Sequence, residues 1–449
     1  MKTNRQFARC LAALALALFI PARGSSQAGL DSFNPYLNSS IESLAVQPDG
    51  KILISGGFTI VDNYYRTNFA RLNPDGRTDT NFVPRIGMYG RRIVVQPDGR
   101  ILVGGIYDPL GPEFRGLVRF ETNGIVDASF NSPLRDMPFA LALQADGKVV
   151  AGFQSRPYIA RFHTDGSPDT NFLAQPDSVV YDLAVQPDGR ILAAGYFEKM
   201  NGQRRWLIAR LNSDGSLDAG FDADVGFVGY NWGVVRKVTV QADRKILFGG
   251  GFTSVHGVSR LNLARLNANG TLDRQFDAGT DGEVHALVVQ ANGRIVVAGD
   301  FTTLKGQPRL RLGRLNWDGS LDTTLTGGAN AFIRAAALQP DGKTVVGGSF
   351  RMLGGVEHTF VGRTAADLTS PPVFIDISSM RVLGGGTHQF SFLNPNAVPF
   401  SVLASADVAA PLASWENLGS ALSVGNGVYQ FTDTDAATHP RRFYRLSAP

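Results

Sequence analysis

Short apolar runs alternate with polar turns along most of this chain. One representative unit has apolar runs at 183–185, 190–195 and 207–211, separated by turns such as Gln-Pro-Asp-Gly and Asn-Ser-Asp-Gly. Runs of this kind, bounded by turn residues, indicate β-strands, and helical periodicity is not seen beyond residue 28. Proline pre-sets φ at the first turn position, while glycine takes the positive φ that closes a hairpin. The pattern therefore predicts an all-β protein built from hairpins.

Three phrases recur along the chain at nearly fixed spacing. They are variants of Gln-Pro-Asp-Gly-Arg, of Ala-Arg-Leu-Asn-x-Asp-Gly and of Leu-Asp-x-x-Phe. The second phrase precedes the end of the third by 11 residues, from arginine to the Phe position, in all six complete cases. Units of about 49 residues with four predicted strands have the size of a β-propeller blade. The glutamines are Gln47, Gln96, Gln144, Gln186, Gln241, Gln290 and Gln339, the arginines are Arg71, Arg119, Arg161, Arg210, Arg265, Arg314 and Arg363, and the third phrase ends at Phe82, Phe130, Phe172, Phe221, Phe276 and Leu325.

The seventh unit lacks the third phrase, and a shorter copy of that phrase stands at the other end of the repeat region. No Leu-Asp-x-x-Phe follows Arg363, whereas Leu30-Asp31-Ser32-Phe33 precedes the first unit. A ring in which the N-terminal strand completes the last blade explains both observations and leaves no open sheet edge. A linear solenoid would need capping repeats and would gain nothing from the displaced strand. We therefore expect a seven-bladed β-propeller over 29–366, with four-stranded blades and closure by the N-terminal strand.

The repeat phrases also resemble those of a known family. Residues 186–192 (Gln-Pro-Asp-Gly-Arg-Ile-Leu) and 209–218 (Ala-Arg-Leu-Asn-Ser-Asp-Gly-Ser-Leu-Asp) are similar to the delta-60 repeat of bacterial exported proteins. The resemblance covers residues 30 to about 363. It implies a β-propeller fold and supplies no activity.

The first 28 residues have the features of a secretory signal peptide. Lys2, Arg5 and Arg9 precede an apolar stretch at 11–20, and Ser-Gln-Ala at 26–28 fits a cleavage site. We expect a secreted, cell-surface or periplasmic protein without membrane insertion, since the stretch is too short for an anchor. Removing its four basic residues from the 43 of the chain balances the 39 acidic ones, so nucleic acid is not an expected partner. The single cysteine, Cys10, leaves with the peptide.

A second, smaller unit is expected after the repeats. Residues 367–372 contain Thr-Ser-Pro-Pro and predict a linker. Short apolar runs at 373–377, 389–393, 400–404, 428–432 and 442–446 then predict a β-sandwich-like module over 373–449. Its segments 401–415 and 441–445 resemble a C-terminal module of bacterial exported proteins. Surface attachment, export sorting and plain stabilisation all remain open as its role.

A candidate ligand site follows from where the repeats differ. We call the four predicted strands of a blade A to D in chain order, from the channel outward. In a propeller the loops between strands B and C and between strand D and the next strand A share one face. Every change in repeat length falls in a segment that carries one of these B–C or D–A loops. The innermost strand starts on that face, near the mouth of the central channel. Arginine forks there would hold an anionic ligand or a carboxylate-bearing sugar. The alternative is a solvated mouth whose charges pair with neighbours such as Asp182. The residues five positions before the glutamines are Glu42, Arg91, Phe139, Tyr181, Arg236, His285 and Arg334.

An insertion of six residues after Phe221 adds aromatic side chains to the same face. Phe227, Tyr230 and Trp232 stand close together within it. Aromatic rings on a loop suit sugar faces or a protein partner. Alternatively, the three rings fold down and plug the channel.

The sequence contains no motif that indicates catalysis, metal binding or cofactor binding. The histidines lack H-x-x-x-H spacing, and the Asp-Gly pairs are explained by hairpin turns rather than calcium. The predicted function is that of an exported, monomeric, non-catalytic scaffold that binds a glycan, an anionic small molecule or a protein. A lyase or hydrolase acting on acidic polysaccharide and a purely structural surface protein are the alternatives.

Overall fold

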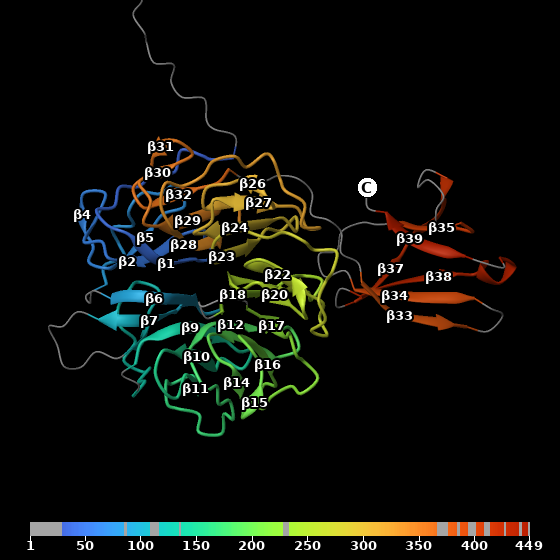
Figure 1. Ribbon diagram of the computed structural model, residues 1–449, viewed down its shortest axis with the longest axis horizontal. Helices are drawn as coiled ribbons and strands as arrows, with labels where there is room; N and C mark the ends of the chain where they lie inside the picture. The colour runs from blue at the N-terminus through green and yellow to red at the C-terminus, as the bar shows by residue number, and fades with distance from the viewer. Residues whose placement is uncertain are drawn as a thin grey trace, which may run out of the picture.

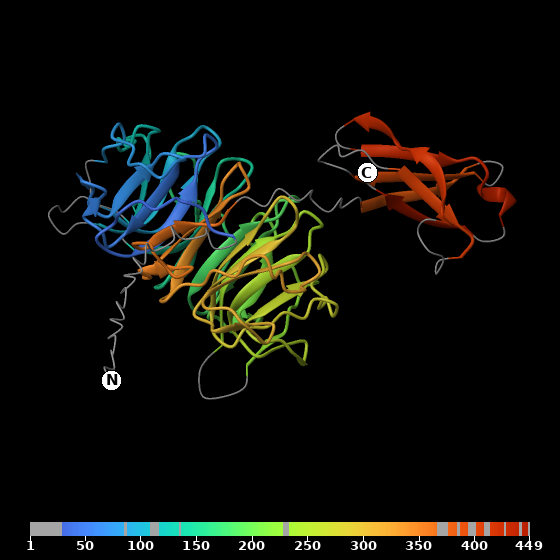
Figure 2. The ribbon, with the colours of Figure 1, turned by 90° about the horizontal axis from the view of Figure 1, so that it is seen from above.

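The computed structural model describes residues 29–84, 88–107, 116–133, 136–227, 233–365, 376–383, 387–393, 401–407, 414–425, 428–439 and 442–447. Regular structure in these ranges is β, apart from short 3-10 segments such as Ala436–Thr438. Accordingly, none of the described residues form a helix long and apolar enough to cross a membrane. Residues 29–365 fold as the propeller and residues 376–447 as a separate β module (Figures 1 and 2).

Each of the seven blades contains an antiparallel three-stranded sheet whose strands follow chain order from the channel outward. The middle strands are buried along both faces because each blade packs between two others; β2 and β24 have no exposed residue. The sheets are β1 (Ile41–Val46), β2 (Ile52–Gly56) and β5 (Phe69–Leu72); β6 (Met88–Val95), β7 (Ile101–Tyr107) and β8 (Leu117–Phe120); β9 (Pro138–Leu143), β10 (Val149–Phe153) and β11 (Ile159–Phe162); β12 (Val180–Val185), β13 (Ile191–Gly195) and β16 (Ile208–Leu211); β18 (Val234–Val240), β19 (Ile246–Gly251) and β22 (Leu263–Leu266); β23 (Val284–Val289), β24 (Ile295–Gly299) and β27 (Leu312–Leu315); and β28 (Ile333–Leu338), β29 (Thr344–Gly348) and β32 (Val361–Arg363).

The predicted fourth strand of each blade is reduced to a single bridge. In blade 4 the only pairing between the outer segment and β16 is Leu211 with Leu217. The Asp218 amide donates to the Arg210 carbonyl as part of this bridge, and the chain then turns where the Phe221 amide donates to the Asp218 carbonyl. The Leu-Asp-x-x-Phe phrase therefore forms a tight turn that inserts its phenylalanine into the core, and does not continue the ladder.

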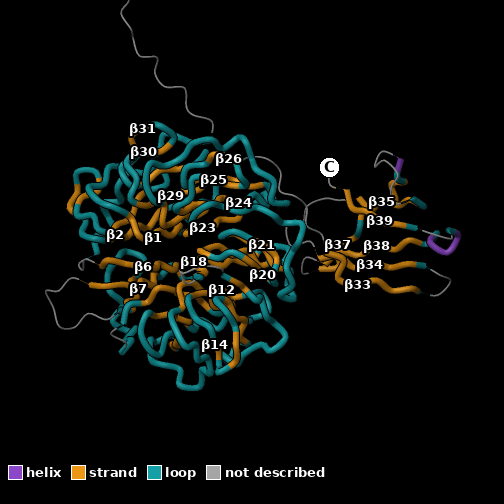
Figure 3. The backbone as a smooth tube through the Cα atoms, viewed as in Figure 1, coloured by secondary structure: helices purple, strands orange, loops and turns teal. Residues whose placement is uncertain are grey.

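Five blades have a short β-hairpin in the connection between the middle and the outer strand of the sheet. They lie at the periphery of the propeller, as β14 and β30–β31 do in Figure 3. The insertion after Phe221 forms β17 (Val225–Gly226), which pairs with the hairpin of blade 5. The hairpins are β3 (Ile60–Val61) with β4 (Tyr64–Tyr65), β14 (Lys199–Met200) with β15 (Gln203–Arg204), β20 (Ser254–Val255) with β21 (Val258–Ser259), β25 (Thr303–Leu304) with β26 (Gln307–Pro308), and β30 (Met352–Leu353) with β31 (Val356–Glu357).

The N-terminal segment completes the last blade, as predicted. Leu30 bridges to Thr364, and the Asp31 carboxylate lies 2.8 Å from Nε of Arg363 in β32. Strand β28 of this blade packs against β1 of the first (Figure 1). The Gln339 side-chain amide also donates to the Gly50 carbonyl of the first blade, at 3.0 Å. These contacts join the two ends of the repeat region into a ring.

The C-terminal module has two sheets that share a small apolar core. One sheet has the order β33 (Asp376–Val382), β34 (His388–Leu393), β38 (Val428–Asp433), β37 (Leu422–Gly425). The other has the order β36 (Glu416–Ser420), β35 (Ser401–Ser405), β39 (Phe443–Ser447). Phe390 and Val402 form the buried core between them. Strands β36 and β37 were not expected from the sequence because they are edge strands rich in polar residues and glycine.

Candidate functional site at the central channel

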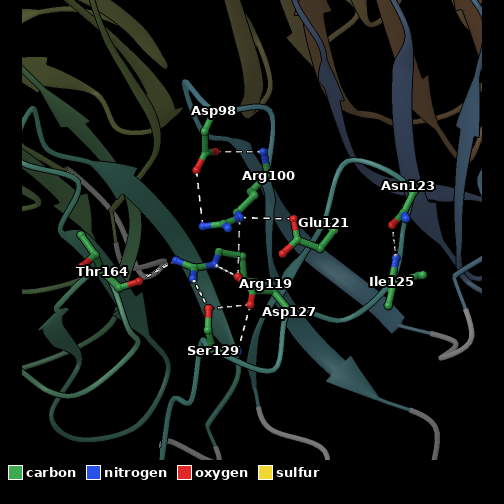
Figure 4. Close-up of polar contacts among 9 residues, drawn as sticks. All are labelled: Asp98, Arg100, Arg119, Glu121, Asn123, Ile125, Asp127, Ser129 and Thr164. Carbon is green, nitrogen blue, oxygen red and sulfur yellow. Dashed lines mark hydrogen bonds and ion pairs between the residues drawn. The ribbon is translucent and has the colours of Figure 1, made fainter.

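The repeated glutamine, arginine, aspartate and phenylalanine form a clamp between blades. In blade 2, Nε of Arg119 lies 2.6 Å from Asp127, and its guanidinium donates to Ser129 Oγ at 3.2 Å (Figure 4). The same guanidinium donates to the Thr164 carbonyl of blade 3 at 2.5 Å. Burial by itself would raise the pKa of Asp127, but the hydrogen bonds from Ser129 and Arg119 outweigh it and lower the pKa.

The clamp recurs around the ring and explains why these phrases are constant. An arginine Nε pairs with an aspartate in every blade, and in most blades the guanidinium also lies over a phenylalanine ring and donates to a carbonyl of the next blade. The constant phrases therefore hold neighbouring blades together. The pairs are Arg71–Asp79, Arg119–Asp127, Arg161–Asp169, Arg210–Asp218, Arg265–Asp273, Arg314–Asp322 and Arg363–Asp31.

The seven residues that stand five positions before the repeat glutamines are called the ring residues below. All seven occupy one structural position, a β-bulge in the innermost strand. The register of β1 on β2 shifts between Ile41 and Ser43, which leaves Glu42 as the extra residue. The same shift occurs at the other six ring residues. The bulge brings the backbone close to the middle strand: a Cβ at Gly56 would lie 2.0 Å from the Ser40 carbonyl oxygen. This close approach explains the glycine that faces the bulge in the middle strand, and the same approach is found at Gly105, Gly250, Gly299 and Gly348.

The ring residues contact one another around the channel mouth. Arg334 lies 3.5 Å from the Glu42 carboxylate. Arg236 lies 3.2 Å from Glu283 and 4.7 Å from the centroid of the Tyr181 ring. Arg91 lies over Phe139 at 5.0 Å, and the Phe139 and Tyr181 rings are 5.5 Å apart, edge to face. Arg334 and Arg236 therefore have carboxylate partners, whereas Arg91 contacts the aromatic ring of Phe139.

One position deeper, an ion triad crosses the channel. Asp182 is buried and lies 2.9 Å from Arg92 and 2.9 Å from Lys237. It also accepts a hydrogen bond from the Val238 amide at 2.9 Å. Arg92 additionally donates to the carbonyls of Phe139 and Tyr181, so the triad connects blades 2, 3, 4 and 5. Asp182, which we considered as a partner for the ring charges, pairs instead with these two cations.

Sequence reasoning missed Arg92, Lys237 and Glu283, although the first two are adjacent to ring residues and Glu283 stands two positions before His285. A bulge lets consecutive residues face the same side of a strand. Reading the positions on either side of the ring residues would therefore have found Arg92 and Lys237. Together the groups around the channel comprise five cations and three carboxylates: Arg91, Arg92, Arg236, Lys237 and Arg334 against Glu42, Asp182 and Glu283.

A cavity of about 180 Å³ lies between the innermost strands at this level. Its polar walls are Ser43, Arg92, Asp182, Lys237, His285 and Arg334. Burial lowers the pKa of His285, Arg236 and Arg334 lower it further, and Glu283 and Asp300 partly oppose them. Burial in the cavity therefore disfavours the protonated form of His285.

The aromatic insertion is only partly within the described residues. Phe227 is half-buried beside Gly233 and follows β17, which joins the peripheral hairpin of blade 5. Tyr230 and Trp232 lie outside the described residues. No cluster of three or more His, Cys, Asp or Glu side chains suited to a metal occurs within the ranges described.

Comparison with known proteins finds propellers among solved structures. Streptogramin B lyase matches with 14% identity over 75% of this chain and 100% of its own, at a TM-score of 0.47. The WD40 β-propeller domain of Doa1 matches with 16% identity over 76% and 97%, also at 0.47. PorZ, a surface component of the type-IX secretion system of Porphyromonas gingivalis, matches with 13% identity over 92% and 58%, at 0.47. A search of the curated proteins finds no match to the chain.

A family model described as a β-propeller domain of unknown function, DUF5122, matches the chain seven times. Six matches run from a repeat glutamine to the Phe position, so they cover the clamp and leave every channel residue outside. The matched residues are 47–82, 96–130, 144–172, 186–221, 241–276, 290–325 and 339–369, more than half of the chain. The chain therefore belongs to the DUF5122 β-propeller family.

Proposed function

We propose that this protein is an exported binding scaffold whose central channel holds the anionic group of a ligand. The observation that supports this most strongly is the excess of positive charge around the channel, where five cations face three carboxylates. On a chain whose charges otherwise balance after residue 28, this concentration is local. Walls of low polarisability focus such a field into the channel.

Arg334 lines the cavity, and Arg91 stands at the same bulge position of the innermost strand in blade 2. The Arg91 guanidinium lies over Phe139, and its Nε is buried without a hydrogen-bond partner. A buried donor without a partner is costly, so a carboxylate oxygen at this point would be favoured. Arg334, whose side chain is 40% exposed, adds a second donor group on the same ring.

The size of the cavity limits the ligand. An engineered apolar cavity of about 150 Å³ holds one benzene molecule. The 180 Å³ of the channel cavity therefore admits one small group and not a whole oligosaccharide. We infer that the ligand inserts a carboxylate-bearing end, such as a terminal uronic acid, while the rest of it lies on the loop face.

The test uses residues 29–449 and isothermal titration calorimetry with galacturonate, glucuronate and their trimers. Neutral galactose and glucose serve as controls for the carboxylate. Each arginine contact to a charged group contributes about 1.5–3 kcal/mol, so Arg91→Ala with Arg334→Ala should abolish measurable binding. Arg77→Ala removes an 87% exposed arginine from the opposite face and should change nothing. Failure of every uronate to bind, or undiminished binding by the double variant, would leave a structural propeller as the better account.

A further inference from the structure

A second polar groove lies on the outer rim, between blades 4 and 5. Its volume is about 750 Å³, within the roughly 300–1,000 Å³ range of small-molecule sites. Gln203, Arg204, Arg205 and Trp206 line it from blade 4. The inserted segment after Phe221 contributes Asp222 and Asp224, and the tip of the β20–β21 hairpin contributes His256. None of these residues belongs to the channel.

The polar groups of this groove are fixed in place. Arg205 is 9% exposed, and its guanidinium donates to the carbonyls of Phe221 and Ala219 at 2.9 and 3.1 Å. Asp222 accepts from the Asp224 amide at 3.1 Å, and its side chain remains 55% exposed. The Nε2 atom of His256 lies 3.1 Å from the Gly270 carbonyl, which can only accept, so the neutral ring keeps Nδ1 as an acceptor.

Trp206 provides the apolar wall. Its ring is half-buried against the core cluster shared by blades 4 and 5. The guanidinium of Arg204, an exposed side chain, lies 4.9 Å from the ring centroid. Cation–π contacts at exposed positions are weak, so a ligand can displace the arginine from the indole.

The equivalent groove between blades 5 and 6 lacks most of this chemistry. The repeat spacing places Leu261 at the position of Trp206, Ser259 at that of Arg204 and Gly279 at that of Asp224. Lys305, at the position of His256, donates to the Asp277 carbonyl at 2.8 Å. Since this groove keeps the same scaffold, Trp206, Arg204 and Asp224 are not needed to join two blades.

We propose that the groove at Trp206 binds a neutral oligosaccharide. Two arginines and two aspartates balance in charge, so the groove does not select an ion as the channel does. Fixed donors and acceptors around a single indole face suit the hydroxyl groups and the apolar face of a pyranose. The site is independent of the channel and takes a different class of ligand.

The experiment titrates residues 29–449 with cellohexaose, xylohexaose, mannohexaose and maltohexaose, followed by tryptophan fluorescence and calorimetry. We expect saturable binding of at least one of them, weakened by about tenfold or more in Trp206→Ala. Because Trp206→Ala removes a half-buried ring, Asp224→Ala is tested beside it, and both are checked by circular dichroism. Leu261→Ala is the matched control in the neighbouring groove and should bind as the wild type does.

Two results would overturn the proposal. One is absence of binding by all four hexaoses up to about 10 mM, where even weak affinities are visible. The other is binding that persists in both Trp206→Ala and Asp224→Ala. The channel variant Arg91→Ala should leave hexaose binding unchanged, so failure of this proposal and failure of the channel proposal are distinguishable.

Discussion

Closure of the ring by the N-terminal segment can be tested by comparing one phenylalanine in two blades. Phe33 is 1% exposed, lies under the Arg363 guanidinium at 4.5 Å, and packs 3.0 Å from the Cβ position of Gly76. Phe276 is 0% exposed, lies under Arg265 at 4.4 Å, and packs 2.8 Å from the Cβ position of Gly319. The two rings therefore have the same surroundings, although only Phe33 is far in sequence from its blade.

If closure is as tight as the other blade junctions, both Phe→Ala variants should lose similar stability. Removing a fully buried phenylalanine costs about 3–5 kcal/mol. Urea denaturation followed by far-ultraviolet circular dichroism measures both losses on the same scale. A loss below about 1 kcal/mol for Phe33→Ala, beside about 3–5 kcal/mol for Phe276→Ala, would refute closure by this segment.

Three further predictions concern the channel and its bulges. Asp182→Ala leaves Arg92 and Lys237 without their carboxylate and should lower the free energy of unfolding by about 3–5 kcal/mol in urea titrations; a loss under about 1 kcal/mol would contradict the triad. The pKa of His285 is lowered on folding, so the unfolded state binds more protons below about pH 6.5. The free energy of unfolding should therefore decrease as the pH decreases in this range, and it should decrease less in His285→Gln. Equal slopes of the unfolding free energy against pH between about pH 5 and 7 would count against this. Gly299→Ala places a Cβ 2.1 Å from the Glu283 carbonyl and should cost about 1–3 kcal/mol or more, while Gly220→Ala, at 3.4 Å from its nearest neighbour, should cost little in the same assay.

The blade number and the displaced strand could be predicted because both depend on repeat spacing. Seven copies of a turn phrase, and one phrase missing at Arg363 but present at Leu30, leave few alternatives to a closed ring. The fourth strand could not be predicted correctly from the same pattern. The apolar residue before Asp-x-x-Phe fits a longer strand or a turn equally well, and the bond from the Phe221 amide to the Asp218 carbonyl forms the turn.

The shared position of the seven ring residues could be found in the sequence, but the charge pairing around them could not. Counting five residues back from each glutamine finds the bulge position, since the distance from the bulge to the glutamine is the same in every blade. Which charges pair depends on contacts between non-adjacent blades, such as Arg92 with Asp182, and no local pattern records these. The proposed site at Trp206 was missed for the same reason, because its walls come from two blades and an insertion.

The most direct test of channel binding is a crystal structure of residues 29–449 soaked with trigalacturonate. We predict electron density for a carboxylate within hydrogen-bond distance of the guanidinium of Arg334, in the cavity that Arg334, Asp182 and His285 line. Density for the sugar elsewhere, with the cavity filled only by water, would contradict the account.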